Sequence, residues 1–433
     1  MKKSKFIKST IILLIGGFIT KILGMIIKIV TTRYLGTEGI GIYSLIMPTF
    51  MILITLSQFG FPIAISKLVS EDKSNNKNLV FGIIPVSMLM NVIIIIFLIL
   101  SSNFISTNLL NEKRTYYALL SMGFVLPFIS ISSIIRGYFF GKEKMIPHVL
   151  SNTIEDITRL ILIILFLPLF LKNGIEFGVA FLILINIISE LISILIFFFF
   201  IPKNFKFKKS YFKLKGNKVK EVMNVSLPIT SSRIIGNIGY FFEPIIMTFC
   251  LLNIGYSNEF IITEYGILNG YIMPLLLLPS FFTMAISQAL IPTVSNNYSR
   301  GNFNYTKNKI KQAVIISLCI GIPITLFIEF FPSVLLKLLY NTTEGICYLK
   351  FLAPICLLLY IQSPLSSSLQ AMGKGKESML GTLYGTIIRT VFLFVLSMFK
   401  IGLWGLVIAT SINVIFVTMY QLKHIIKLFK KCS

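Results

Sequence analysis

The stretch GFITKILGMI, residues 17–26, lies inside an apolar run that extends from Ile11 to Val30. That run has the length needed to cross a bilayer as a helix. Yet Lys21 stands near its middle and Lys28 follows seven residues later. Lys21, Gly24 and Lys28 fall at i, i+3 and i+7, so they share one face of the predicted helix. A charge in the middle of a membrane is costly, and it usually faces a bundle interior or a wet cavity.

The whole chain is too apolar to fold as a soluble domain. Of its 433 residues 55% are hydrophobic and 13% charged, and the mean hydropathy is +0.86. These values predict a multi-pass membrane protein. The segment after the basic start MKKSKFIKST is too long for a signal peptide and has no small-residue cleavage site, so it reads as an uncleaved first span.

Hydropathy predicts an all-α protein with about twelve transmembrane helices. The twelve segments expected to span the membrane are 7–32, 42–66, 79–104, 116–139, 148–171, 177–201, 223–251, 265–292, 310–336, 347–371, 378–399 and 402–422. With the N-terminus inside, 28 of the 40 Lys and Arg fall on the inner side and seven on the outer side. This excess predicts that both termini are cytoplasmic. The basic loop at 202–221 acts as a topology anchor or also touches anionic headgroups.

The chain also repeats itself. SSIIRGYFFGKEKM (132–145) aligns without gaps to SSSLQAMGKGKESM (366–379), AISK (64–67) to AISQ (285–288), and KILG (21–24) to RIIG (233–236). The matches occur in the same order and predict two pseudo-symmetric six-helix lobes with a cavity between them. We expect an N-terminal lobe at 1–202, a basic linker at 203–222 and a C-terminal lobe at 223–433.

Five cations inside predicted spans are the candidate substrate-binding residues: Lys21, Lys28, Arg159, Arg233 and Arg389. The repeat pairs Lys21 with Arg233, which would place them on opposite lobes across the cavity. Lys28 lines the cavity or extends its ammonium to the outer interface. A cationic cavity favours an anionic cargo such as a phosphate or pyrophosphate.

Two acids inside spans are candidate coupling or ion-pair residues. Glu155 precedes Arg159 by four residues, the favourable order for an ion pair within a helix. Glu243 is a candidate site for a coupling proton or Na⁺, or a structural neighbour of Arg233. No cofactor is expected: the chain lacks the GxxxxGK[ST] phosphate loop, and its five cysteines form no metal-ligand pattern. With no nucleophile–base arrangement, an enzyme is not expected, nor is a nucleic-acid partner or ATP.

Three longer stretches carry a family resemblance. RYLGTEGIGIYSLIMPTFMILITLSQFGFPIAISKLVSED (33–72), RGYFFGKEKMIPHVLSNTIEDITRL (136–160) and LPSFFTMAISQALIPTVS (278–295) resemble the stage V sporulation protein B and polysaccharide-exporter family. That family belongs to the multidrug/oligosaccharidyl-lipid/polysaccharide exporter superfamily, which includes lipid II flippases. The resemblance implies two six-helix lobes in a V that work by alternating access.

The resemblance also implies a function. A flippase of this kind turns a polyprenyl-pyrophosphate-linked glycan, such as a cell-wall or polysaccharide precursor, across the bacterial cytoplasmic membrane. Basic residues of the first span line the cavity in lipid II flippases, and Lys21 and Lys28 match them as Lys where Arg is usual. The family usually carries two further C-terminal spans that are not seen here. Two alternatives remain: a multidrug/cation antiporter of the same fold, and a non-transporting scaffold for wall or spore-cortex enzymes, which would be partners.

Overall fold

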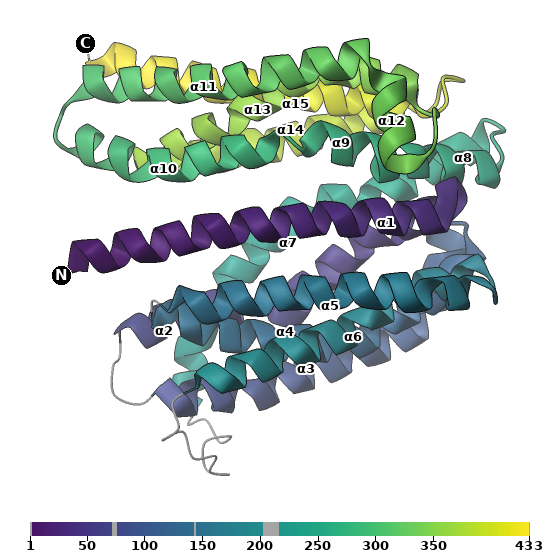
Figure 1. Cartoon of the computed structure of the whole chain (residues 1–433), viewed down its shortest axis with the longest axis horizontal. Coiled ribbons are helices and arrows are strands. Elements are labelled where there is room, and N and C mark those ends of the chain that lie inside the picture. The colour runs from purple at the N-terminus through teal and green to yellow at the C-terminus, as the bar shows by residue number, and fades with distance from the viewer. Residues whose placement is uncertain (1, 72–75, 143, 202–215, 433) are drawn as a thin grey trace. The chain divides into compact units, whose positions relative to one another are not determined.

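A computed structural model describes residues 2–71, 76–142, 144–201 and 216–432, and the described chain is helical throughout its regular elements (Figure 1). Contacts divide it into two compact units, Met1–Phe241 and Phe242–Ser433, which meet within one long helix. Among the described residues, ten helical runs are long and apolar enough to cross a membrane. The predicted helical membrane protein is therefore confirmed. The predicted lobe limits and the cytoplasmic placement of the termini stay predictions, and linker residues 203–215 lie outside the described ranges.

The described part of the first unit contains six α-helices, two short helical turns and the first part of a seventh α-helix. Its elements are α1 (Lys2–Gln58), α2 (Phe61–Glu71), α3 (Asn76–Phe104), the π-helical turn η1 (Ile105–Leu109), the 3₁₀ turn η2 (Lys113–Thr115), α4 (Tyr116–Gly141), α5 (Met145–Leu171), α6 (Ile175–Phe200) and the first part of α7 (Gly216–Asn253).

Helix α1 contains the first predicted span, 7–32, and most of the second, 42–66, whose last residues lie in α2. Its backbone breaks at Gly36, where φ is +65°, a conformation that glycine adopts without a Cβ penalty. The predicted spans leave residues 33–41 as a loop between them. The structure instead shows helix on both sides of a single kinked residue, Gly36. A second break at Phe59 and Gly60, with φ of +43° and +64°, separates α1 from α2.

The second unit repeats this arrangement. Its elements are the end of α7, α8 (Asn258–Gly266), the π-helical turn η4 (Ile267–Ile272), α9 (Met273–Leu277), α10 (Ser280–Ser299), α11 (Phe303–Phe330), α12 (Pro332–Tyr340), α13 (Ile346–Ala371), α14 (Gly375–Leu396) and α15 (Trp404–Cys432). The predicted span 265–292 is therefore split among four elements, and the predicted span 310–336 runs across the α11–α12 junction.

Packing within each unit follows the internal repeat. Helix α4 packs on α2, α3 and α6, and α13 packs correspondingly on α10, α11 and α15. Helix α5 packs on α6 as α14 packs on α15. The matched segments 132–145 and 366–379 both form a turn between two helices, α4–α5 and α13–α14, with Glu143 outside the described residues. The two units therefore share one topology.

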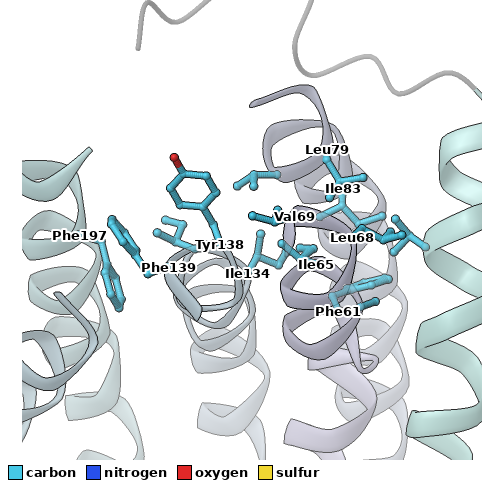
Figure 2. Close-up of a cluster of buried hydrophobic side chains, with 14 of the residues drawn as sticks. Phe61, Ile65, Leu68, Val69, Leu79, Ile83, Ile134, Tyr138, Phe139 and Phe197 are labelled. Carbon is cyan, nitrogen blue, oxygen red and sulfur yellow. The ribbon is translucent and has the colours of Figure 1, made fainter. Parts of the chain in front are cut away.

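Each unit has an apolar core near one end. In the first unit Phe61, Ile65 and Ile134 are buried between α2, α3 and α4, and Phe139 stacks on Phe197 of α6 with ring centroids 5.3 Å apart (Figure 2). Burial of such side chains contributes about 1.5–3 kcal/mol each where the alternative is water. In a bilayer, close packing rather than burial from water must hold these helices together.

Candidate functional site

The cation stripe of α1 lies on a face of the helix that is open within the described chain. Lys21 is exposed, and a Cβ placed on Gly17 or Gly24 would meet no atom within 4 Å. The opposite situation holds at Gly16, where a Cβ would lie 2.4 Å from the Val149 side chain of α5. Helix α1 thus packs on α5 through Gly16, and this packing leaves Gly17, Lys21 and Gly24 accessible.

Lys28, one turn beyond Gly24, has an aromatic neighbour. Its ammonium lies 5.7 Å from the centroid of the Tyr43 ring, which belongs to the part of α1 after the Gly36 kink. A cation over an aromatic face at this distance is attracted by the ring quadrupole. Tyr43 in turn lies within electrostatic range of Arg159 on α5. The kink at Gly36 therefore brings a ring from the second span under a cation of the first.

Arg233 is exposed on the part of α7 that packs with the first unit. Gly236, one turn later, also faces open space, since a Cβ there would meet nothing within 4 Å. Nearby, the Asn237 side-chain amide donates a hydrogen bond to the Thr55 hydroxyl at 3.1 Å, which holds α7 beside the end of α1. Both Lys21 and Arg233 thus belong to Met1–Phe241, and their facing each other across a cavity stays a prediction.

Arg159 lies in a buried ion-pair cluster. Its guanidinium is 2.8 Å from Glu155 and 3.3 Å from Asp156, so the pair predicted from the i,i+4 spacing is confirmed. Arg136 of α4 adds a second guanidinium 3.4 Å from the other Glu155 oxygen. The sequence placed Arg136 in the repeated turn segment but did not indicate this role, because its partner lies on another helix.

Glu190 of α6 is a further acid in this cluster. It is 8% exposed and lies within electrostatic range of Glu155, Arg136 and Arg159, and its Oε2 has no hydrogen-bond partner in the described chain. The cluster therefore joins α4, α5 and α6 through alternating charges. Such a network stabilises the buried groups mutually, because removing one partner leaves the other uncompensated.

Arg389 and Glu243 form the corresponding ion pair of the second unit. The Arg389 guanidinium lies 2.5 Å from Glu243 Oε2, and the Tyr265 hydroxyl donates to Glu243 Oε1 at 3.1 Å. Arg389 Nε also lies 3.3 Å from the Thr410 hydroxyl. The four residues come from α14, α7, α8 and α15. The cation beside Glu243 is thus Arg389, whereas the sequence had suggested Arg233.

The five candidate cations therefore divide into two groups. Arg159 and Arg389 are paired with carboxylates. Lys21, Lys28 and Arg233 have no carboxylate within 4.0 Å in the described ranges, and their binding to an anion stays a prediction. Within the same residues there is no group of three His, Cys, Asp or Glu that could hold a metal ion.

Comparison with known proteins agrees with this fold. The family model described as polysaccharide biosynthesis protein matches residues 6–298, and the MatE model matches residues 244–395. The chain is 34% identical over 430 residues to stage V sporulation protein B of Bacillus subtilis, covering 97% of this chain and 83% of that protein. It is 22% identical over 426 residues to the lipid II flippase MurJ of the same species, covering 90% and 76%.

A solved structure shares the architecture. A multidrug resistance MATE family transporter of the MOP superfamily, in an inward-facing conformation, superposes with a TM-score of 0.78 at 16% identity and covers 98% of both chains. At this identity the likeness shows the fold alone. The ten apolar spans and these relatives make this a multi-pass protein of the cytoplasmic membrane. With a family model matching more than half its length and a relative above 30% identity, the chain belongs to the polysaccharide biosynthesis protein family.

Proposed function

We propose that this protein translocates a polyprenyl-pyrophosphate-linked glycan across the cytoplasmic membrane by alternating access, and that it is not an enzyme. The observation that carries the proposal is the group of cations without a carboxylate partner, Lys21, Lys28 and Arg233, beside glycines that leave the helix faces open. A pyrophosphate offers several acceptor oxygens to such cations, and each contact is a charge-assisted hydrogen bond. Lysine supplies a point charge without the bidentate geometry of arginine.

In this mechanism the headgroup enters from the cytoplasm and its pyrophosphate meets Lys21, Lys28 and Arg233, while the lipid tail stays in the bilayer. Neutralising part of the phosphate charge lowers the cost of holding it inside the membrane. Rocking of the lobes then exposes the headgroup to the other side. In this mechanism Arg159 and Arg389 do not contact the cargo: Arg159 pairs with Glu155 of its own helix, and Arg389 joins α14 to α7 through Glu243.

The coupling ion is a separate part of the proposal. Glu243 is a less suitable proton or Na⁺ site than it was from sequence, because Arg389 already supplies its counter-charge. Glu155 is bridged by two guanidiniums. The membrane potential is a sufficient drive, at about 2.3 kcal/mol per charge per 100 mV. If Glu243→Gln changed the pH dependence of transport while protein abundance held, Glu243 would be a coupling residue after all.

A cation antiporter is the second candidate, because the MatE model matches residues 244–395 and the solved relative is a multidrug transporter. A binding site for a cationic drug needs unpaired acids. Glu155 and Glu243 are neutralised by arginines, and Glu190 lies within electrostatic range of Arg136 and Arg159. The charge of the site therefore favours an anionic cargo. Sensitivity to cationic dyes on deletion would favour the antiporter, and full function with neutral residues at positions 21 and 233 would favour a scaffold.

The test is complementation of a strain whose lipid II flippase is depleted. Wild type, Lys21→Ala, Arg233→Ala and the double variant are compared at equal membrane abundance, with Lys172→Ala as the control for an exposed lysine away from the stripe. We expect rescue by wild type and the control and failure of the double variant. Rescue by all variants would refute the role of these cations. No rescue by wild type would direct the search to another lipid-linked glycan, or to the antiporter or scaffold.

A further inference from the structure

Helices α11 and α15 of the second unit are longer than the hydrocarbon layer of a membrane is thick. Helix α15 has 29 residues and α11 has 28. At 1.5 Å per residue they extend about 43 and 42 Å. The hydrocarbon layer of a bilayer is about 30 Å. A helix of this length that runs close to the membrane normal extends about two turns beyond the hydrocarbon layer.

The projecting turns lie at the same end of the unit. Ile310 and Ala313 near the start of α11 belong to one buried cluster with Ile425 and Phe429 near the end of α15. Figure 1 shows the C-terminus beside the start of α11. The start of α11 and the end of α15 are thus held side by side by a shared apolar core.

Lysines line the outer side of these turns. Lys423, Lys427 and Lys430 occur at i, i+4 and i+7 of α15, so they form one exposed stripe on the face opposite Ile425 and Phe429. Lys307 and Lys311 form a similar exposed pair one turn apart on α11. Within the described part of the chain, none of these five lysines has a carboxylate within 4.0 Å.

The acid and the aromatic residues at this end strengthen the argument. Glu377 of α14 is half-buried, and its carboxylate contacts His424 rather than a lysine: His424 Nε2 lies 3.4 Å from Glu377 Oε2. Tyr305, 49% exposed, carries the Lys309 ammonium over its ring at 5.2 Å. Tyrosine with lysine at a helix end is typical of the level of lipid headgroups.

The geometry points to a binding surface for the headgroups of anionic phospholipids at this end of the unit, made by two basic stripes: Lys307 and Lys311 of α11, and Lys423, Lys427 and Lys430 of α15. The occupant is a lipid of the leaflet that this end of the unit faces, because its phosphate lies at the depth that the projecting turns reach while its acyl chains contact the apolar helix surfaces below. The general excess of basic residues on the cytoplasmic side of membrane proteins depends only on how many Lys and Arg lie there. It does not require two stripes at helical spacing that flank one core.

The experiment measures lipid binding by the full chain, independently of transport. Phosphatidylglycerol with a fluorescent acyl chain is titrated with purified protein in nonionic micelles, and anisotropy gives the dissociation constant. The test variant is Lys423→Gln/Lys427→Gln/Lys430→Gln. The matched control is Lys337→Gln/Lys350→Gln/Lys400→Gln, three exposed lysines outside the proposed surface.

A lysine near an anionic surface contributes about fivefold to affinity. We therefore expect the test variant to bind at least tenfold more weakly and the control to stay within twofold of wild type. The same dye on phosphatidylcholine should bind at least tenfold more weakly than on phosphatidylglycerol. If the α15 triple variant does not fold, Lys307→Gln/Lys311→Gln tests the proposal at the α11 stripe.

Three outcomes would overturn the proposal. One is equal binding of the two lipids by wild type. The second is an equal loss in test and control variants, which would mean that only net charge matters. The third is displacement of phosphatidylglycerol by excess free glycerol phosphate, which would assign the surface to a soluble phosphate compound.

Discussion

The Arg389 guanidinium of α14 lies 2.5 Å from the Glu243 carboxylate of α7, and the two side chains are 13% and 7% exposed. Removing one member of a buried pair leaves a charge without compensation, which costs about 3–5 kcal/mol. We expect Arg389→Met to lower the free energy of unfolding by about that amount. The measurement is denaturant unfolding of the purified chain in detergent.

The double variant distinguishes a pair from two unrelated residues. Glu243→Leu with Arg389→Met removes both charges, so it should lose less stability than Arg389→Met alone. Losses that simply add would show that the two residues do not stabilise each other. A double variant that is stable but does not transport would instead give the pair a role in transport.

We expect the aromatic ring of Tyr43, rather than its hydroxyl, to position Lys28 and support activity. The ring face holds the Lys28 ammonium at 5.7 Å, an interaction worth about 0.5–2 kcal/mol. We expect Tyr43→Phe to keep most flipping activity and Tyr43→Leu to lower it three- to tenfold at equal abundance. The readout is growth on flippase depletion, together with labelling of Lys28 by an amine reagent, which should rise in Tyr43→Leu only. Equal behaviour of the two variants would contradict a positioning role.

Substitution by alanine should have opposite effects on stability at two glycines of the first span, Gly16 and Gly24. Gly16 lies against Val149, and overpacking of that kind costs about 1–3 kcal/mol, so Gly16→Ala should lower stability. Gly24 meets nothing within 4 Å, and Gly24→Ala should stabilise the helix by about 0.5–1 kcal/mol. Thermal unfolding of the two variants checks this contrast.

A larger side chain at position 24 tests the open face itself. Gly24→Leu should leave abundance unchanged and yet block flipping, because the side chain would project from the face that carries Lys21 and Lys28. A functional Gly24→Leu would mean that the headgroup does not approach this face. Gly255→Leu is unsuitable as a control, since φ there is +95°. Gly375→Leu, with one distant neighbour at 3.9 Å, is the matched control.

The sequence predicted the spans because twenty consecutive apolar residues leave few alternatives. It missed the shape of the breaks. Hydropathy does not record that Gly36 adopts a φ of +65°, nor that Ile267–Ile272 forms a π-helical turn. These features depend on local backbone geometry and on neighbouring helices.

The ion pairs of the candidate site were likewise only partly predictable from the sequence. Glu155 and Arg159 were predictable as a pair because they are four residues apart on one helix. Glu243 and Arg389 are separated by 146 residues, and no spacing rule connects them. The charges inside spans were therefore identified from sequence, while their partners required the fold.

Arg114 links two segments at one end of the first unit through ion pairs, and its substitution is the last prediction. Its guanidinium lies 2.5 Å from Glu38, which follows the α1 kink, and donates to both Glu112 oxygens at 2.8 and 3.0 Å. The group is 33% exposed, so solvent weakens these charge-assisted bonds and Arg114→Ala should cost about 1–2 kcal/mol. The neighbouring exposed Lys113→Ala should change stability by less than about 0.5 kcal/mol. Glu38→Gln should show a smaller loss than Arg114→Ala, since the two Glu112 bonds remain. If Arg114→Ala and Lys113→Ala unfold at the same temperature, the contact between the α1 kink and the loop before α4 does not stabilise this end of the unit.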